Sequence, residues 1–281
     1  MDAAAYLSTA GRQVDAEILT RLKGSNLPTE LAGAMSHLLF PSGKRLRPAL
    51  VLAACEGLGG TPSAASAAAA AVEFLHTYSL VHDDLPCMDD DPLRRGRPTV
   101  HVRYGEALAV LAGDALQALA FESLTAPVES WSAAAVADLA KAAGAANLVG
   151  GQVDDLAVER GAEAGASAEL GDRIQSIHLR KTAALFAAST SIGARCAGAG
   201  EGVRSRMEGF GRDLGLAFQI ADDCLDRDKD EPCTILRVWD ESHAMGVAHQ
   251  RIENALEALE GLGSKADPLR ALARFAGNRD H

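Results

Sequence analysis

The chain has 281 residues, with 27 lysines and arginines against 38 aspartates and glutamates, for a formal net charge of −11. This acidity argues against nucleic acid as a partner, because nucleic-acid binding needs a basic surface. The five cysteines are odd in number and lack CxxC spacing, which argues against a zinc site and a disulfide framework. We expect reduced thiols in a cytoplasmic protein.

The start of the chain, MDAAAYLSTAGRQVDAE, is acidic and broken by polar residues, so we expect no signal peptide. The longest apolar run, from about Ala64 to Leu75, is mostly alanine and is interrupted by Ser66 and Glu73. We therefore expect no membrane span.

Apolar residues recur at helical spacing almost throughout, and no convincing alternating run indicates a strand. The pattern predicts helices at roughly 2–23, 28–40, 46–58, 63–85, 99–123, 131–158, 167–195, 201–228, 241–260 and 266–277. The glycine- and proline-containing breaks are too short to link independent domains. We predict one all-α domain over residues 1–281. Several alanine-rich helices are apolar on more than one side, which favours a helical homodimer.

A basic segment, PSGKRLRPAL, opens the helix predicted at 46–58. Lys44 and Arg47 lie three residues apart where a helix N-terminus itself favours anions. A solvated basic first turn is the alternative. Because cations there oppose the helix dipole, we favour an anion-binding site.

The stretch HTYSLVHDDLPCMDDDPLRRGRPTVHVRY follows the most apolar helix. Its charged residues come in two groups: Asp83, Asp84, Asp89, Asp90 and Asp91, and then Arg94, Arg95 and Arg97. A solvated acidic turn is the alternative, but buried carboxylates need a partner or a metal. His76, Ser79 and Asp83 share a helix face, and Pro86 lets the chain turn back. Oxygen ligands suit Mg²⁺, and arginines suit phosphate.

A second acidic group lies in FQIADDCLD, where Asp222 and Asp226 share a helical face and Asp223 lies beside them. The segment IHLRKTAALF places Lys181 and Thr182 in an apolar helix. A lysine there either reaches the surface or, if it faces carboxylates, contacts a diphosphate. GGQVDDL offers Gln152 and Asp155, for which a structural role is equally open. We expect the two acidic groups to face each other across a cluster of Mg²⁺ ions.

In combination, these motifs resemble the trans-isoprenyl diphosphate synthases of the short-chain bacterial type, the farnesyl and geranylgeranyl diphosphate synthases. The resemblance covers about residues 35–228 and rests on GKRLRP, DDLPCMD, LRRGRPT, GGQ, HLRKT and FQIADDCLD, which occur in the family's order. It implies an all-helical fold around a deep central cavity. It also implies condensation of isopentenyl diphosphate with an allylic diphosphate, with three Mg²⁺ ions bound alongside the diphosphate.

The resemblance assigns roles to most of the residues above. The implied metal ligands are Asp83, Asp89 and Asp222, and the implied catalytic set adds Asp84, Asp223, Asp226 and Lys181. The allylic substrate would contact Arg94, Lys181, Thr182 and Gln219. Isopentenyl diphosphate would contact Lys44, Arg47, His76 and Arg95.

Product length depends, in this family, on the residues just before the first aspartates. Tyr78 and Ser79 stand there, and an aromatic residue five positions before the motif resembles farnesyl-type enzymes. Cys87 and Met88 also occur in geranylgeranyl-type sequences. We expect farnesyl diphosphate, with geranylgeranyl diphosphate as the alternative.

One departure from the family follows Asp226, where the chain reads RDKDEPCTILRV. A segment with two lysines that would close over the diphosphate is shortened, and only Lys229 could substitute. Two other functions stay open. A terpene cyclase would not need the basic pocket around Lys44 and Arg47, and a non-catalytic partner subunit would not need both aspartate motifs.

Overall fold

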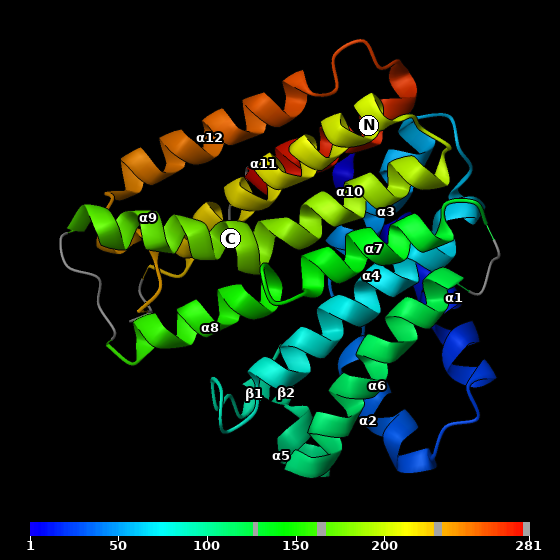
Figure 1. Cartoon of the computed structure of the whole chain (residues 1–281), viewed down its shortest axis with the longest axis vertical. Coiled ribbons are helices and arrows are strands. Elements are labelled where there is room, and N and C mark those ends of the chain that lie inside the picture. The colour runs from blue at the N-terminus through cyan, green and yellow to red at the C-terminus, as the bar shows by residue number, and fades with distance from the viewer. Residues whose placement is uncertain (126–128, 162–166, 228–231, 278–281) are drawn as a thin grey trace.

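The computed structural model describes residues 1–125, 129–161, 167–227 and 232–277 (Figure 1). In chain order the elements are α1 (Ala3–Gly24), α2 (Thr29–Leu39), α3 (Leu46–Gly57), α4 (Pro62–Asp83), β1 (Leu93–Arg94), β2 (Arg97–Pro98), α5 (Val100–Tyr104), α6 (Glu106–Thr125), α7 (Ser132–Ala143), α8 (Leu148–Glu159), α9 (Ser167–Ile177), η1 (His178–Ala183), α10 (Ala184–Cys196), α11 (Glu201–Leu225), η2 (Ile235–Arg237), α12 (Glu241–Glu257), η3 (Ser264–Ala266) and α13 (Asp267–Gly277). The predicted all-α class is confirmed.

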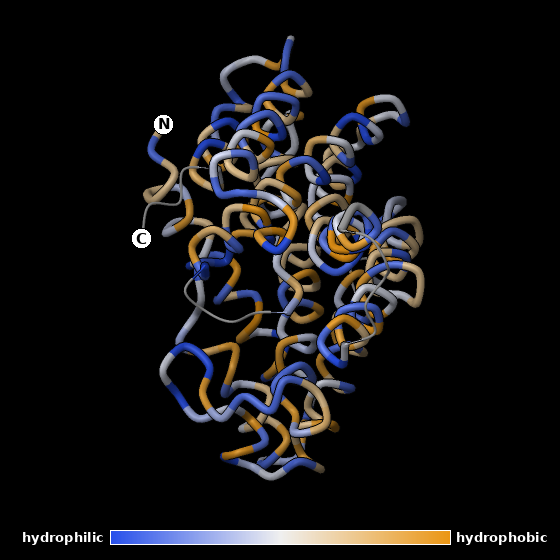
Figure 2. Tube along the Cα trace, turned by 90° about the vertical axis from the view of Figure 1, so that its left-hand side faces the viewer, coloured by the Kyte–Doolittle hydropathy of each residue, from blue (hydrophilic) through white to orange (hydrophobic). Residues whose placement is uncertain are grey.

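Helices α4 and α10 form the centre of the fold. α4 packs against α1, α3, α6 and α10, while α10 packs against α3, α4, α7 and α11. Alanine fills much of the α4 surface, and Ala68 to Val72 are all fully buried. These small side chains let neighbouring helices approach on several sides. Figure 2 shows orange and blue stretches mixed along the tubes of the helices.

Two of the predicted long helices are interrupted. The helix predicted at 99–123 divides into α5 and α6 at Gly105, whose φ of 87° is a left-handed conformation that ends a helix. The helix predicted at 131–158 divides into α7 and α8 around Gly144 and Asn147. α11 ends at Leu225, short of the predicted 228.

A small hairpin follows the first aspartate motif, where the sequence indicated no strand. Leu93 pairs with Pro98 and Arg94 with Arg97 in antiparallel register. The two residues of its turn, Arg95 and Gly96, have φ of 54° and 72°. Positive φ at both central residues is what a two-residue hairpin turn of type I′ needs.

The helix predicted at 167–195 is continuous but is not α-helical along its whole length. Its middle, His178–Ala183, is a π-helical segment with the sequence HLRKTA. Such bulges are frequent at functional sites, because the inserted residue changes the direction of the side chains. This bulge contains Lys181 and Thr182, two of the predicted site residues.

Helix α6 is long and apolar enough to cross a membrane, judged by length and composition alone, and 44% of its most apolar window is buried. It packs against α2, α4, α5 and α7. This packing is typical of a core helix. On its other side, Val110 and Leu111 are 40% and 55% exposed.

The close packing of α11 against α10 can be tested at two glycines of α11. A Cβ at Gly211 would lie 2.4 Å from the Phe186 carbonyl oxygen, whereas a Cβ at Gly209 meets nothing nearer than 3.9 Å. We expect Gly211→Ala to lower the free energy of unfolding by about 1–3 kcal/mol. Gly209→Ala should raise it by up to about 1 kcal/mol, through helix propensity. Urea unfolding at one protein concentration measures both, and equal effects would contradict this packing.

Candidate active site

The first aspartate motif begins at the C-terminal end of α4. After Pro86 the chain turns back, and the backbone N–H of Asp89 donates to the carbonyl oxygen of Asp83 over 2.9 Å. The predicted return of Asp89 toward Asp83 is therefore present. The pKa of Asp83 is raised to about 7, mainly by burial and in part by Asp89, while Lys181 opposes the shift. The two carboxylates crowd each other, and a cation would relieve that repulsion.

Asp84 and Arg94, two of the predicted site residues, bind each other. Asp84 is fully buried and accepts a 2.5 Å hydrogen bond from Arg94 Nε, and Arg94 Nη2 also donates to Asp91 over 3.3 Å. The hairpin at residues 93–98 thus folds back onto the end of α4. Oδ2 of Asp84 is buried without a hydrogen-bond partner.

Lys181 lies among carboxylates from several parts of the chain. Its Nζ donates to Asp155 Oδ2 of α8 over 2.6 Å. Burial lowers the pKa of Lys181, but Asp155, Asp83 and Asp89 outweigh that effect, so its pKa is raised. The lysine therefore carries a positive charge that faces the first aspartate motif. Of the two roles left open for Asp155, the structure favours a place in the site.

Asp89, Asp155 and Lys181 line a pocket of about 340 Å³, and Asp83 does not. Its lining comes from five segments: Asp89, Asp91, Asp155, Glu159, Ile177, His178, Lys181, Thr182, Gln219, Pro232 and Cys233. Thr182 donates to the side-chain oxygen of Gln219 over 2.8 Å, which joins η1 to α11. The predicted allylic-diphosphate residues Lys181, Thr182 and Gln219 are thus brought together, while Arg94 is held by Asp84 and is not part of the lining.

The second aspartate motif divides between two positions. Asp223 is buried and accepts hydrogen bonds from Gln219 Nε2 over 3.1 Å and from the backbone N–H of Ile235 over 2.7 Å. It therefore anchors the segment after α11. Asp222 and Asp226 are half-buried and lie three and seven residues after Gln219, on nearly the same side of α11. Neither lines the pocket.

Where the described residues resume after α11, at Pro232, the chain lies at the pocket. Pro232 and Cys233 line it, and Thr234 caps the short helix η2. Lys229, the predicted substitute for the family's lysines, lies outside the described residues. Cys233, His178 and Glu159 are among the lining residues that were not predicted. Of these, only His178 carried a signal in the sequence, because it precedes Lys181 in the same short motif.

A second pocket, of about 360 Å³, collects the predicted isopentenyl diphosphate residues. It is lined by Gly43, Lys44, Arg45, Leu46, Arg47, Glu73, His76, Arg95, Phe218 and Phe275. Arg47 Nη1 lies 3.3 Å from His76 Nε2, and its guanidinium lies 4.6 Å from the centre of the Phe186 ring. Burial and the neighbouring arginines lower the pKa of His76 well below its usual value. A neutral imidazole among cations leaves the pocket ready for an anion.

Tyr78 and Ser79 line neither of these pockets. Tyr78 is 5% exposed and packs edge-on against His82, with ring centres 5.8 Å apart. His82 in turn contacts the carbonyl of Val110 on α6, over 3.0 Å. The Tyr78 ring therefore lies on the α4 face toward α6. Ser79 Oγ donates to the carbonyl of His76 over 2.9 Å, within its own helix.

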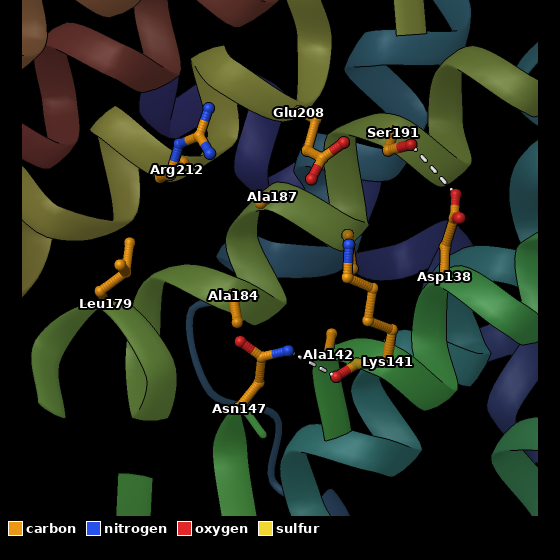
Figure 3. Close-up of a pocket in the computed structure, with 11 residues that line it drawn as sticks. Asp138, Lys141, Ala142, Asn147, Leu179, Ala184, Ala187, Ser191, Glu208 and Arg212 are labelled. Atoms are coloured by element: carbon orange, nitrogen blue, oxygen red, sulfur yellow. Dashed lines mark hydrogen bonds between the residues drawn. The ribbon is translucent and has the colours of Figure 1, made fainter. Parts of the chain in front are cut away.

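A third pocket, of about 230 Å³, lies between α7, α10 and α11 and contains none of the predicted site residues (Figure 3). Its floor is made of alanines, and its rim includes Lys141 and Arg212. Ser191 donates to Asp138 over 3.1 Å at one end, where Arg195 also binds Asp138. The charges of this rim are of both signs, so it does not select a polyanion.

The carboxylates around the acidic pocket can be compared with the ligands that Mg²⁺ prefers. Within the described residues, no three histidine, cysteine or acidic side chains lie close enough to hold a metal ion on protein ligands alone. Mg²⁺ does not need such a group, because it commonly takes one or two carboxylates and completes its shell with water and substrate phosphate. The crowded carboxylates of Asp83 and Asp89, with Oδ1 of Asp155 buried and without a hydrogen-bond partner, fit that binding mode.

The acidic and the basic pocket meet at α11, where Gln219 lines the first and Phe218 lines the second. The sequence profile of the polyprenyl synthetase family matches residues 28–234. The chain belongs to this family, and it is a prenyltransferase.

Similar proteins come from plants and bacteria. The chain is 41% identical to the heterodimeric geranylgeranyl pyrophosphate synthase large subunit 1 of Arabidopsis thaliana, over 90% of this chain and 73% of that protein. It is 43% identical to the geranylgeranyl pyrophosphate synthase of Capsicum annuum, with the same coverages. A crystal structure of an FPP/GFPP synthase from Zymomonas mobilis superposes with a TM-score of 0.89 at 38% identity, covering 97% of this chain and 99% of that one.

The buried His178 makes the stability of the fold depend on pH. Burial lowers its pKa from 6.5 to about 4, and its Nε2 lies 3.4 Å from Asp223. Because the unfolded chain binds the proton more readily, stability is fully present above pH 6.5 and is lost as the pH falls toward 4. The loss is about 3 kcal/mol.

We expect His178→Gln to remove this part of the acid sensitivity, whereas the change His249→Gln at an exposed histidine should not. Denaturant unfolding between about pH 4 and pH 7 measures the difference. Parallel pH curves for the wild type and His178→Gln would contradict the burial argument.

Proposed function

We propose that this protein condenses isopentenyl diphosphate with an allylic diphosphate to extend a prenyl chain. The single observation that carries the proposal is the convergence of Asp89, Asp155, Lys181 and Gln219 on one pocket. A basic pocket lined by Lys44, Arg47, His76 and Arg95 accompanies it. The carboxylates of the acidic pocket suit a diphosphate that carries bound metal ions. The cations of the basic pocket suit a diphosphate without metal.

The residues divide the work between the two pockets. Lys181 holds the allylic diphosphate, and Thr182 and Gln219 orient it. Asp83 and Asp89, with Asp222 on α11, would hold Mg²⁺, three ions in the implied arrangement, which when bound offsets negative charge on the departing diphosphate. Lys181 also stabilises that growing charge. Lys44, Arg47, His76 and Arg95 hold isopentenyl diphosphate so that its double bond faces the allylic carbon.

Asp84, Asp223 and Asp226 take supporting parts in this proposal. Asp84 fixes Arg94, and Asp223 fixes Gln219 together with the segment that begins η2. Asp226 follows the end of α11 and lies on the side that bears Gln219. These carboxylates order the groups that contact the substrates, so their loss should weaken binding as well as turnover.

We propose geranylgeranyl diphosphate as the main product. The plant relatives named above support it, as does the packing of Tyr78 against His82 rather than in either substrate pocket. Farnesyl diphosphate is the second candidate, favoured by the aromatic residue five positions before the first motif. In that case Tyr78 would limit the chain to fifteen carbons.

We propose further that residues 1–281 form one catalytic domain, active in the cytoplasm as a homodimer. α1 and α13 flank the family match at 28–234, and both pack against α3, which supports a single unit. A dimer would cover the exposed apolar side chains Val110 and Leu111 of α6. A non-catalytic subunit is less well supported, because both aspartate motifs and the basic pocket are complete.

The metal-binding assignment predicts the behaviour of single aspartates. Asp83→Ala or Asp222→Ala should lower turnover at least about 100-fold, because each removes a proposed ligand of the Mg²⁺ that would offset negative charge on the departing diphosphate. Asp213→Ala, on the same helix but paired with Arg251 of α12, is the matched control and should keep most activity. Chromatography of dephosphorylated products measures turnover, and circular dichroism checks the fold. Full activity in Asp222→Ala would refute the assignment.

Product length is predicted for the wild type and for one variant. With isopentenyl diphosphate, farnesyl diphosphate and Mg²⁺, the wild type should release a twenty-carbon product. Tyr78→Phe should behave in the same way, since the ring and its packing are kept. A wild type that stops at fifteen carbons, combined with a Tyr78→Ala variant that reaches twenty, would make Tyr78 the limit and farnesyl diphosphate the product.

The dimer is predicted to depend on the outer face of α6. Light scattering should give twice the monomer mass for the wild type, and Leu111→Glu should shift it toward the monomer by placing a charge in the covered face. Exposed Leu19 of α1 offers a control change to glutamate, which should leave the dimer intact. A monomeric wild type would overturn the proposal.

A further inference from the structure

Arg45 lies in the middle of the basic run between Lys44 and Arg47, yet it is the one buried cation there. It is 3% exposed, while Lys44 is exposed. Its Nε donates to Asp15 of α1 over 2.9 Å, its Nη2 donates to the carbonyl of Leu39 over 2.6 Å, and its Nη1 donates to Glu73 of α4. One guanidinium therefore joins α1, the end of α2 and α4 at the start of α3.

The backbone at Arg45 is in the left-handed region, with a φ of 51°. This conformation is unfavourable for a residue with a side chain, and it persists only where the surroundings fix it. Arg45 precedes the first residue of α3, so its conformation sets how the chain enters that helix. Lys44, one residue before it, and Arg47, two residues after it, both line the basic pocket. The bonds of the guanidinium thus hold the turn that brings them there.

Among the described residues that line this pocket, Glu73 is the only carboxylate, and it is 3% exposed. Burial lowers the pKa of Arg95, and the charge of Arg45 lowers it further, while Glu73 raises it. The guanidinium of Arg95 packs directly over Gly43, where an added Cβ would lie 2.7 Å from its carbon. Glu73 therefore offsets the repulsion within a group of cations that would otherwise separate when no anion is bound.

We propose that Arg45 and Glu73 are a positioning pair that pre-arranges Lys44, Arg47 and Arg95 for the diphosphate of isopentenyl diphosphate. The inference rests on the proposed function of the basic pocket. Neither Arg45 nor Glu73 needs to touch the substrate. Arg45 fixes the turn, and Glu73 keeps the cations together. A pair that served only stability would affect both substrates equally.

Binding measurements without turnover separate these two roles. Isopentenyl diphosphate alone and geranyl diphosphate alone cannot condense, so calorimetry gives the Kd of each with purified protein. Arg45→Lys keeps the positive charge, but a lysine cannot make all three of the hydrogen bonds that Arg45 makes to α1, α2 and α4. Glu73→Gln keeps the shape and removes the counter-charge. Arg195→Lys is the matched control, because it weakens a two-bond ion pair with Asp138 outside both substrate pockets.

We expect Arg45→Lys and Glu73→Gln each to raise the Kd of isopentenyl diphosphate about tenfold, with the Kd of geranyl diphosphate changed less than about twofold. Simple charge attraction predicts the opposite for Glu73→Gln, which would bind the anion more tightly. Tighter binding there, an unchanged Kd in folded Arg45→Lys, or equal losses for both ligands would overturn the proposal. If Glu73→Gln does not fold, the charge-conserving Arg45→Lys decides.

A failure of the positioning pair can be distinguished from a failure of the proposed reaction. A wild type that binds isopentenyl diphosphate but makes no prenyl product would contradict the proposed reaction, while the comparison with Arg45→Lys would still test the pair. A wild type that makes product, with Arg45→Lys unchanged in its Kd, would overturn the pair alone. A wild type that binds no isopentenyl diphosphate would overturn both.

Discussion

The repulsion between carboxylates at the end of α4, held in check by Lys181, is the constraint on which the rest of the site depends. Asp83 and Asp89 are brought together by a backbone hydrogen bond, and burial raises the pKa of Asp83 to about 7. Such a group is costly until cations reach it. One cation, Lys181, comes from a π-helical bulge, and its bond to Asp155 ties α8 to the same point. The remaining negative charge is what a divalent ion would neutralise.

Each of the two pockets gathers side chains of like charge around one side chain of opposite charge. In the acidic pocket the half-buried Lys181 offsets several carboxylates, and in the basic pocket the buried Glu73 offsets several cations. In each pocket, one ion of opposite sign lowers the repulsion among the like charges around it. The hairpin at residues 93–98 serves both, because Arg94 turns to Asp84 while Arg95 lines the basic pocket. Positive φ at Arg95 and Gly96 makes the turn between them possible.

Much of this fold could be predicted from the sequence, because helical periodicity is a local property. The bounds of α3 and α4 lie within two residues of the prediction. Other features could not be predicted. The helix breaks at Gly105 and Gly144 were missed because a single glycine in an apolar helical pattern does not mark a break. The π-helical bulge at His178–Ala183 was missed because it lies inside a continuous helical pattern. The hairpin was missed because two-residue strands have no period to detect.

Among the site residues, the sequence identified the charges but not their partners. The sequence left two positions open for Lys181, at the surface or facing carboxylates, and the structure shows the second. That Arg94 is held by Asp84, and Asp223 by Ile235, depends on tertiary contacts. Asp155 could not be decided, because an aspartate on a helix gives no indication of burial. Arg45 was indistinguishable from Lys44 and Arg47 in the sequence, and only its bonds to three other segments separate it from them.

The most direct measurement is a crystal structure of the protein with Mg²⁺ and geranyl thiodiphosphate, which cannot ionise readily. The account predicts metal ions bound by Asp83 and Asp89 on one side and by Asp222 on the other, with the diphosphate between them and Lys181 in contact with it. A diphosphate bound only by arginine and lysine side chains, with Asp222 free of metal and turned to solvent, would contradict the central claim.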